Sequence, residues 1–589
     1  MKQLLYIVLA GGISLAMGAC QKTFLDLEPQ DELTDVVYFK RPADFKAYTT
    51  GFYSQLMGWK SPFGGNSIYQ YMDAGSDLST NTGFSGDYAR GNITVPGDDN
   101  RWSNPYNWIR SANILLENAA AYTGSQEEIK QYMAEASFFR ANAYFTLLRF
   151  FGGVPLVTTV PGVKSPELTA PRNSRYEVID LILSDLDKAI AGLPAEQEIA
   201  AADKGRISKW AAGAYKARVL LYEATWRKYV GTSTDFAGSG GPSSEQVSAF
   251  LTETISLCKE VMDNGGYELW DQNNTLDGQS SYFLFNLEDG GSNPAGLTKA
   301  TNKEFILYGV YDFTYRQGGQ NLTHTTAQMI PSRKMMDLYL CTDGLPPAKS
   351  PLFQGYHNVG DEFRNRDLRM TAYHGEAPAS ATLDNGLAGY GNRKFAVYNY
   401  GSYRNANQES SNYSIIRLAD VYLMYAEALY EKNGSISDAQ LDESVNKIRA
   451  RAGVAPLTNA LVAANGLSML EEIRNERARE LYQEGLRFDD LKRWGIAEAA
   501  LNASTCGMVV GDAAYTTAFR DASGDATASY KPAAYVWGEE TVATAAGNLS
   551  CVVIDSKSNR NFKRTHYLLP IPATQLVLNP NLQQNPGYN

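Results

Sequence analysis

Histidine and cysteine are scarce in this sequence. Its 589 residues include four histidines and five cysteines, and neither type is spaced like the ligands of a zinc site. The sequence also lacks a G-x-S-x-G nucleophile elbow, an H-E-x-x-H motif and a phosphate-binding loop. These absences argue against a metalloenzyme, a serine hydrolase and a nucleotide-dependent enzyme. We therefore expect no catalytic residues, no resident metal and no cofactor.

One loop is a minor candidate for a cation. In DQNNTLDG, the residues Asp271, Asn273, Thr275 and Asp277 place side-chain oxygens at alternate positions. The loop lacks the glycine at the sixth position and the closing glutamate of an EF-hand, so calcium binding is a weak alternative.

Positive charge and long apolar runs are also limited. Lysine and arginine number 53 against 64 acidic residues, which gives a formal net charge of -11. Nucleic acid is therefore not expected as a partner, because phosphate neutralisation needs clustered basic residues. Beyond the first 20 residues no segment approaches 18 uninterrupted apolar residues, so we expect no membrane-spanning helix.

The first 20 residues predict export and anchoring. Lys2 precedes an apolar run from Leu4 to Met17, and the small residues Gly18 and Ala19 then lead to Cys20. This pattern is typical of a signal peptide over residues 1–19. The position of Cys20 resembles the acylated cysteine of a bacterial lipobox, and the alternative is a plain signal peptide with an incidental cysteine. Among the later cysteines, Cys506 and Cys551 are a candidate disulfide outside the cytoplasm.

Apolar spacing predicts a mainly α fold built from helix pairs. Periods of three and four residues indicate helices over 42–57, 104–122, 125–151, 174–192, 208–228, 244–263, 414–432 and 438–452. For the helix over 125–151, Ser125 and Glu128 suggest a capping box. Pairs of this length resemble divergent tetratricopeptide repeats, which stack into a scaffold.

The pattern divides the chain into a helical scaffold and a loop-rich part. We expect the scaffold around 42–57, 104–264 and 414–500. A loop-rich, irregular α/β half around 58–103, 265–412 and 501–565 would be inserted and packed on it. Four prolines between residues 570 and 586 predict an extended tail over 566–589.

Charged residues gather in two helical segments. Arg417, Asp420 and Glu427 fall within one stripe of an otherwise apolar helix, which predicts an ion network. Residues 471–493 alternate acidic and basic side chains, which is typical of a salt-bridged, partly solvated helix face. A pair of catalytic glutamates is the alternative, but neighbouring arginines would lower their pKa values, which is wrong for a general acid.

Several motifs occur together in a recognisable order. They are FLDLEPQDELT, WSNPYNWIRSANILL, AEASFFRANAYFTLLRFFGGVPLV, GRISKWAAGAYKARVLLY, IIRLADVYLMYAEALY, IRNERARELYQEGLRFDDLKRWG and LLPIPATQLVLNPNLQQNPGY. With this order over residues 20–589, the chain resembles the SusD/RagB family of Bacteroidetes outer-membrane lipoproteins. The resemblance implies one SusD-like unit, anchored to the cell surface, that binds glycan and passes it to a SusC-like TonB-dependent transporter. Some members of the family bind peptides instead.

Aromatic residues supply the candidate binding site. The chain has 37 Tyr, 23 Phe and 8 Trp, and the rings are dense in the loop-rich part. Sugar rings offer an apolar face for stacking and hydroxyls for hydrogen bonds, which suits rings with polar edges. The candidate ligand-binding residues are Trp59, Tyr71, Asp73, Trp270, Tyr282, Tyr315, Arg316 and Tyr403. Among them, Trp270 is expected to lie outside the core, because it sits in a polar loop.

Three functions remain open at this point. A non-enzymatic glycan-binding receptor subunit is the leading hypothesis. A peptide-binding member of the same family is the second, and a glycoside hydrolase is the third and least favoured.

Overall fold

The computed structural model describes residues 38–64, 73–81, 87–241, 244–323, 329–356, 360–374, 390–509, 541–544 and 547–588. The signal peptide, Cys20 and Tyr71 lie outside the described residues. No helix among the residues that are described is long and apolar enough to cross a membrane.

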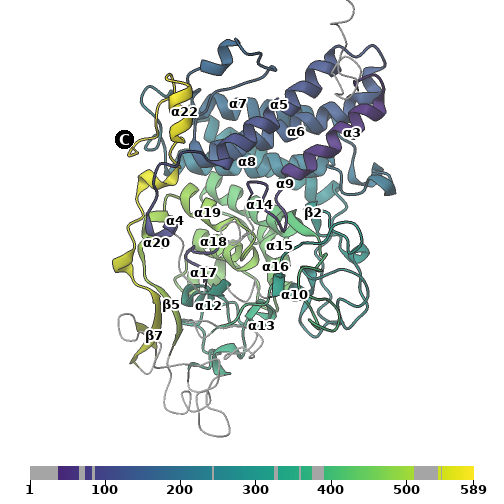
Figure 1. The fold of residues 1–589 in the computed structure, drawn as a ribbon. Coiled ribbons are helices and arrows are strands. Elements are labelled where there is room, and N and C mark those ends of the chain that lie inside the picture. Colours follow the sequence, from purple (N-terminus) through teal and green to yellow (C-terminus); the bar gives the residue numbers. More distant parts are fainter. Residues whose placement is uncertain are drawn as a thin grey trace, which may run out of the picture.

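One layer of the molecule consists of long helices, drawn from purple to teal in Figure 1. They are α3 (Pro42–Phe52), α5 (Asn100–Ala120), α6 (Gln126–Phe151), α7 (Arg175–Gly192), α8 (Lys209–Tyr229) and α9 (Ser244–Asn264). Neighbours in the chain pack on one another: α5 on α6, α6 on α7, and α8 on α9. The helices predicted for this part are therefore present in a predominantly helical fold, although α5 packs on α6 more than on α3.

Polar side chains cap several of these helices. The Asp99 carboxylate accepts the backbone N–H of Arg101 at 2.8 Å, and Ser174 forms a capping box with Glu177. The capping box predicted for Ser125 is wrong, because its side chain makes no cap hydrogen bond. Such caps satisfy N–H groups that have no partner within the helix.

A second group of helices lies below the first layer in Figure 1. It comprises α14 (Leu418–Asn433), α15 (Asp438–Asp442), α16 (Val445–Arg451), α17 (Asn459–Ala464), α18 (Met469–Glu480), α19 (Arg487–Arg493) and α20 (Ala497–Asn502). Helix α14 packs against both α9 and α18, so it joins the two groups. The predicted helix over 414–432 begins later than expected, because Tyr413–Arg417 form strand β4.

The charged segment over 471–493 is not one helix. It is interrupted between α18 and α19 at residues 481–486, where Gln483 and Gly485 adopt φ values of 60° and 77°. A left-handed conformation ends a right-handed helix and favours glycine. The interruption lets α19 turn and pack against α8.

The predicted ion network is present and is deeper than expected. The Arg417 guanidinium contacts Glu304 at 2.8 Å and Glu480 at 2.5 Å, and Asp420 contacts Arg218 at 2.6 Å. The expectation of a partly solvated face is wrong, because Glu480 is buried. Although burial raises the pKa of a carboxyl, the surrounding arginines outweigh it and hold the pKa of Glu480 well below its ordinary value.

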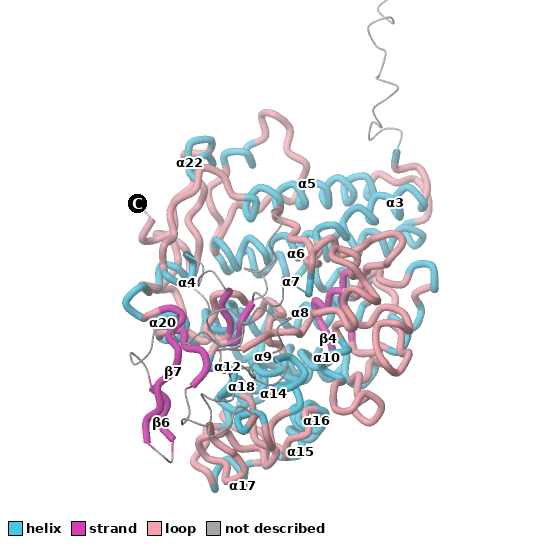
Figure 2. The backbone as a smooth tube through the Cα atoms, turned by 60° about the horizontal axis from the view of Figure 1, so that its bottom comes forward, coloured by secondary structure: helices cyan, strands magenta, loops and turns pink. Residues whose placement is uncertain are grey.

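The loop-rich part contains short helices and small antiparallel sheets. Its helices are α4 (Asp87–Arg90), α10 (Ser280–Leu284), α12 (Arg333–Leu338) and α13 (Leu368–His374). Its strands, together with β4, are β1 (Ser79–Asn81), β2 (Phe305–Gly309), β3 (Met329–Pro331), β5 (Thr505–Val509), β6 (Thr541–Thr544) and β7 (Gly547–Asp555). β1 pairs with β3, β2 with β4, and β7 with β5 and β6. Figure 2 shows how much of this part is loop.

Strands β5 and β7 carry the two cysteines of the candidate disulfide. Cys506 pairs with Val553, and Cys551 pairs with Val509. The cysteines are therefore not opposite each other, and the register does not favour the predicted bond.

The C-terminal segment is not wholly extended, contrary to the prediction. Residues Ala573–Leu578 form helix α22, and Tyr567, Ile571 and Asn585 are buried. The Asn585 amide donates hydrogen bonds to the carbonyls of Phe151 and Leu569, which fix this segment to the end of α6.

Two hydrophobic clusters form most of the core. The larger lies among the long helices and α14, and the second lies under the loop-rich part. The second cluster contains Trp59, Trp270 and Tyr282, which are three of the predicted ligand-binding residues.

Candidate ligand-binding surface

Trp270 belongs to the core. Only 3% of its surface is exposed, its indole N–H donates to the Thr301 hydroxyl at 3.0 Å, and its backbone N–H donates to Glu304 at 2.9 Å. The prediction that this ring lies outside the core is wrong. Asp271, the next residue, is exposed, whereas the Trp270 ring packs inward in the second hydrophobic cluster.

Trp59 and Tyr282 are also core residues, and their polar atoms are hydrogen-bonded within the protein. The Trp59 indole N–H donates to the Ser411 carbonyl at 2.7 Å, and its ring packs edge-on against Tyr413. The Tyr282 hydroxyl donates to the Ala396 carbonyl at 2.7 Å. Neither ring is available to a ligand at the surface, because each fills a packed position and its polar atom already has a partner.

Asp73 is a buried structural carboxylate. It has a φ of 63° and accepts the backbone N–H groups of Gly485 and Arg487 at 3.1 and 2.8 Å. Burial raises the pKa of Asp73 to about 7. The residue therefore holds the link between α18 and α19, and it does not face outward.

The other three described candidates lie outside the core, since Tyr315 and Arg316 are exposed and Tyr403 is half-buried. Tyr315 and Arg316 lie on one tight turn, in which the backbones of Asp312 and Arg316 bond to each other at 2.8 and 2.9 Å. The Asp312 carboxylate accepts the N–H groups of Thr314 and Tyr315, which fixes the turn. Tyr315 is 90% exposed, so its ring projects into solvent.

Two further residues complete this surface. The Arg404 guanidinium lies 4.3 Å from the ring centre of Phe313 and 3.9 Å from that of Tyr403, so it contacts both rings. We call Phe313, Tyr315, Arg316, Tyr403 and Arg404 the ring platform. Sequence reasoning missed Phe313, because the alternation of Tyr311, Phe313 and Tyr315 also suits a buried strand. Only Tyr311 of these three is buried.

Two carboxylates neutralise Arg404. Its Nε lies 2.9 Å from Glu288 and its Nη2 lies 3.0 Å from Asp289. The Tyr403 hydroxyl donates to Asp289 at 2.8 Å. Burial raises the pKa of Asp289, but hydrogen bonds from Gly291, Tyr403 and Arg404 outweigh this and lower it. The carboxylate therefore stays charged and keeps both neighbours in place.

The platform rests on a hydrogen-bonded base. The Lys299 ammonium donates to the carbonyls of Tyr311 and Ser410, both at 2.6 Å. Ser410 in turn donates its backbone N–H and its hydroxyl to Glu288 at 2.8 and 2.7 Å. The Tyr311 hydroxyl accepts the backbone N–H of Trp59 at 2.8 Å. The rings thus stand on loops that are fixed to one another and to strands β2 and β4.

The described part of the chain offers no group of three or more His, Cys, Asp or Glu that could hold a metal ion. In the candidate calcium loop, Asp271 accepts the backbone N–H of Asn273 at 3.0 Å, and Asn273 accepts that of Ser280 at 3.2 Å. These oxygens serve the loop itself, and calcium binding stays a prediction.

Comparisons with known proteins agree with the fold. The family model described as "SusD family" matches residues 371–588, and the one described as "Starch-binding associating with outer membrane" matches residues 23–221. The chain is 25% identical over 505 residues to SusD-like protein P25 of Formosa agariphila, covering 81% of this chain and 87% of that protein.

Solved structures from Bacteroides fragilis have the same fold. A SusD-like protein has a TM-score of 0.67 at 24% identity, covering 95% of this chain and all of that one. A second, described as a SusD-like carbohydrate binding protein, has a TM-score of 0.67 at 23% identity, covering 93% of this chain and all of that one.

Proposed function

Because the chain belongs to the SusD/RagB family, we propose that it is a surface-exposed, non-enzymatic receptor that captures an oligo- or polysaccharide and delivers it to a SusC-like TonB-dependent transporter. The description of one solved relative as carbohydrate binding supports the ligand class. The association with the outer membrane in the name of one family model supports the location.

The ring platform is the observation that carries the proposal. Phe313 is 43% exposed and Tyr315 is 90% exposed. A contiguous exposed apolar patch with a polar rim is typical of an interaction site. The apolar faces of sugar rings stack on aromatic side chains, and their hydroxyls accept and donate hydrogen bonds. Arg316 and the Tyr403–Asp289 pair supply polar partners beside the rings.

The attachment of the receptor follows from its N-terminus. Acylation of Cys20 would hold the mature chain at the outer membrane through residues 20–37, which precede the described structure. A single acyl chain binds a membrane only marginally, so lipoprotein-type multiple acylation is part of the proposal.

Binding measurements on platform variants test the ligand class. We expect the mature chain to be retarded in affinity gels that contain a cognate polysaccharide, and Tyr315→Ala and Tyr403→Ala to lose most of this retardation. Val577→Ala on α22 is a matched control, because this side chain is also strongly exposed but lies on a different element.

A parallel panel of peptides and an assay of reducing-sugar release complete the test. Binding to peptides but to none of a panel of plant, host and microbial polysaccharides would favour the peptide-binding alternative. Release of reducing sugar would contradict the non-enzymatic assignment.

A further inference from the structure

A guanidinium stands beside the exposed ring of the platform without an acidic partner. Arg316 is exposed, follows Tyr315 on the same turn, and forms no ion pair with any of the described residues. Arg404, on the same platform, is by contrast paired with Glu288 and Asp289. Arg316 is therefore the platform arginine whose charge is left for a ligand.

Neutral groups hold the Arg316 guanidinium in place. It lies 4.4 Å from the ring centre of Tyr311, and its Nη1 donates to the Val310 carbonyl at 3.1 Å. Tyr311 is buried and accepts the backbone N–H of Trp59, so the ring under the guanidinium is fixed. A side chain that is already ordered loses less conformational entropy when it binds. Because a guanidinium has five N–H donors, several remain for a ligand.

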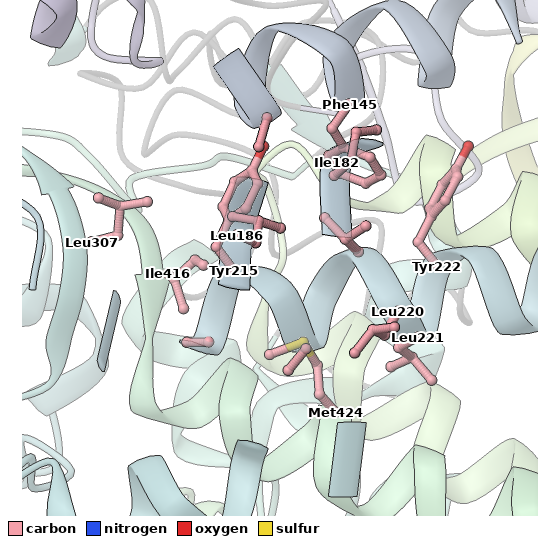
Figure 3. Close-up of a cluster of buried hydrophobic side chains, with 14 of the residues drawn as sticks. Phe145, Ile182, Leu186, Tyr215, Leu220, Leu221, Tyr222, Leu307, Ile416 and Met424 are labelled. Atoms are coloured by element: carbon pink, nitrogen blue, oxygen red, sulfur yellow. The ribbon is translucent and has the colours of Figure 1, made fainter. Parts of the chain in front are cut away.

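The strands below this turn are anchored in the core. Tyr311 follows strand β2, and β2 pairs with β4, where Leu307 lies opposite Ile416. Both of these side chains are buried in the larger hydrophobic cluster, together with Tyr215 (Figure 3). The turn therefore has a rigid support, which presents the charge of Arg316 at a defined place.

A second cation lies against the same segment. A Cβ atom built on Gly319 would lie 2.9 Å from the Nζ of Lys60, and Gly319 is three residues after Arg316. Lys60 is exposed and also has no ion pair within the described part of the chain. Two cations without an ionic partner in the described structure therefore lie on or against residues 316–319.

The carboxylates near the platform are balanced within the protein. Two of them contact Arg404, as described above. Backbone N–H groups of its own turn lower the pKa of Asp312, and the nearby Lys299 lowers it further. Glu409 accepts the N–H of Gly318 through its carbonyl, and burial raises the pKa of its side chain to about 7, so its negative charge is reduced near neutral pH. The positive charge of the two unpaired cations is therefore in excess at the platform.

We propose that the ring platform selects an acidic glycan, in which a sugar carries a carboxylate or a sulfate group. The sugar ring lies against Tyr315, and its anionic group accepts from Arg316 and is attracted by Lys60. A guanidinium suits such oxyanions, because two parallel N–H donors can meet two oxygens. This inference rests on the proposed function and deepens it, because it names the chemical class of the glycan.

Affinity gels with matched polysaccharides test the proposal on the whole mature chain. The acidic panel contains polygalacturonate, alginate, carrageenan and chondroitin sulfate, and each is paired with its methyl-esterified or desulfated form. We expect at least one acidic polysaccharide to bind, and its neutral form to bind much more weakly. The binding should also weaken as the salt concentration rises, because salt screens exposed charges. The esterified and desulfated arms show whether carboxylate or sulfate is recognised.

Two substitutions with opposite effects separate charge from structure. Arg316→Gln should weaken binding of the acidic glycan by about three- to tenfold, between the effect of an exposed ion pair and that of a buried charged hydrogen bond. Asp312→Asn keeps the oxygen that accepts the two backbone N–H groups but removes a negative charge, so it should strengthen the same binding by up to about threefold. Changes of opposite sign would not result if both residues only supported the turn.

Lys303→Gln is the matched control. Lys303 is exposed like Lys60, but it is paired with Glu268 at 3.2 Å and contributes no side chain to the platform. Its loss should leave binding of the acidic glycan nearly unchanged, whereas Lys60→Gln should weaken it.

Failure of this inference can be distinguished from failure of the proposed function. If neutral polysaccharides bind as well as their acidic forms, the chain is a glycan receptor but the acidic preference is overturned. Equal effects of Arg316→Gln and Lys303→Gln would overturn the role of Arg316. If no polysaccharide of either kind binds, the proposed function fails together with this inference.

Discussion

Aromatic residues of this protein serve either the core or the surface, and burial separates the two groups. Trp270 is packed, and both of its N–H groups have partners. We therefore expect Trp270→Ala to destabilise the fold by about 3–5 kcal/mol, the usual cost of emptying a large aromatic site. The folded fraction should bind glycan like the parent. Chemical denaturation and affinity gels on the same preparation check both statements.

Tyr315→Ala is the opposite case. Its ring is exposed, so stability should change by less than about 0.5 kcal/mol, as for other surface substitutions. Glycan affinity should fall by about 1–2 kcal/mol if the ring is a binding hot spot. A variant that melts many degrees lower and binds normally would show that the platform is structural.

Asp73 should make the stability of the fold depend on pH. Burial raises the pKa of Asp73 from 3.8 to about 7, so the folded state holds its proton more tightly than the unfolded state between these values. The contribution of this group is therefore most favourable at low pH and is lost as pH rises through about 7. Asp73→Asn cannot ionise, so its free energy of unfolding should rise relative to that of the parent as pH increases from 5 to 8. If the difference between the two free energies of unfolding stayed constant across that range, the prediction would be contradicted.

At the residue level the sequence could indicate the region of the site but not its members. The density of rings between residues 266 and 320 is visible in the sequence, and two of the candidates in this range, Tyr315 and Arg316, are exposed. Trp270 and Tyr282 could not be separated from them, because the side that a loop residue faces depends on contacts with distant residues such as Thr301 and Ala396.

At the level of elements, the buried ion network joins helices that are far apart in the sequence. Glu480 of α18 contacts Arg369 at 2.8 Å, Arg417 at 2.5 Å and Arg451 at 2.5 Å. Removing one partner of a buried ion pair leaves uncompensated charge, which costs about 3–5 kcal/mol. We expect Glu480→Ala to unfold at much lower urea concentration than the parent.

Glu471→Ala is the matched control for this network. Glu471 lies on the same helix, but its side chain is more than half exposed, and its one ion pair among the described residues is with Arg474, at 3.5 Å. Its loss should change stability by less than about 1 kcal/mol. Equal effects of the two substitutions would show that burial does not determine the strength of these pairs.

Helix periodicity predicted the long elements well and the interruptions poorly. The helices from α5 to α9 appear close to their expected positions, because three- and four-residue spacing directly reports a buried face. The break at 481–486 was missed, although Gly485 was a signal, because the charge pattern continues through it. One of its left-handed residues, Gly485, is held by Asp73, which lies more than 400 positions away in the sequence.

At the scale of the whole molecule, anchoring is expected to depend on Cys20. The apolar run from Leu4 to Met17, followed by the small residues Gly18 and Ala19 and then by Cys20, matches a lipoprotein signal. Cys20→Ala should therefore stall processing or release the protein from the membrane fraction. Palmitate labelling of the parent and fractionation of both proteins check this. Equal membrane partitioning without any label would contradict it.

The second prediction at this scale concerns the transporter. Under the proposed function this chain captures the glycan, and a separate SusC-like transporter moves it across the membrane. The long helices α5–α9, packed on one another, offer a broad and rigid surface for such a partner. Purification in mild detergent through a C-terminal tag should therefore recover a large TonB-dependent protein. It should do so equally for Tyr315→Ala, because we propose that the ring platform binds glycan and not the transporter. Recovery of this chain alone in several gentle detergents would count against the partnership, and loss of the partner only in Tyr315→Ala would place the platform at the interface instead.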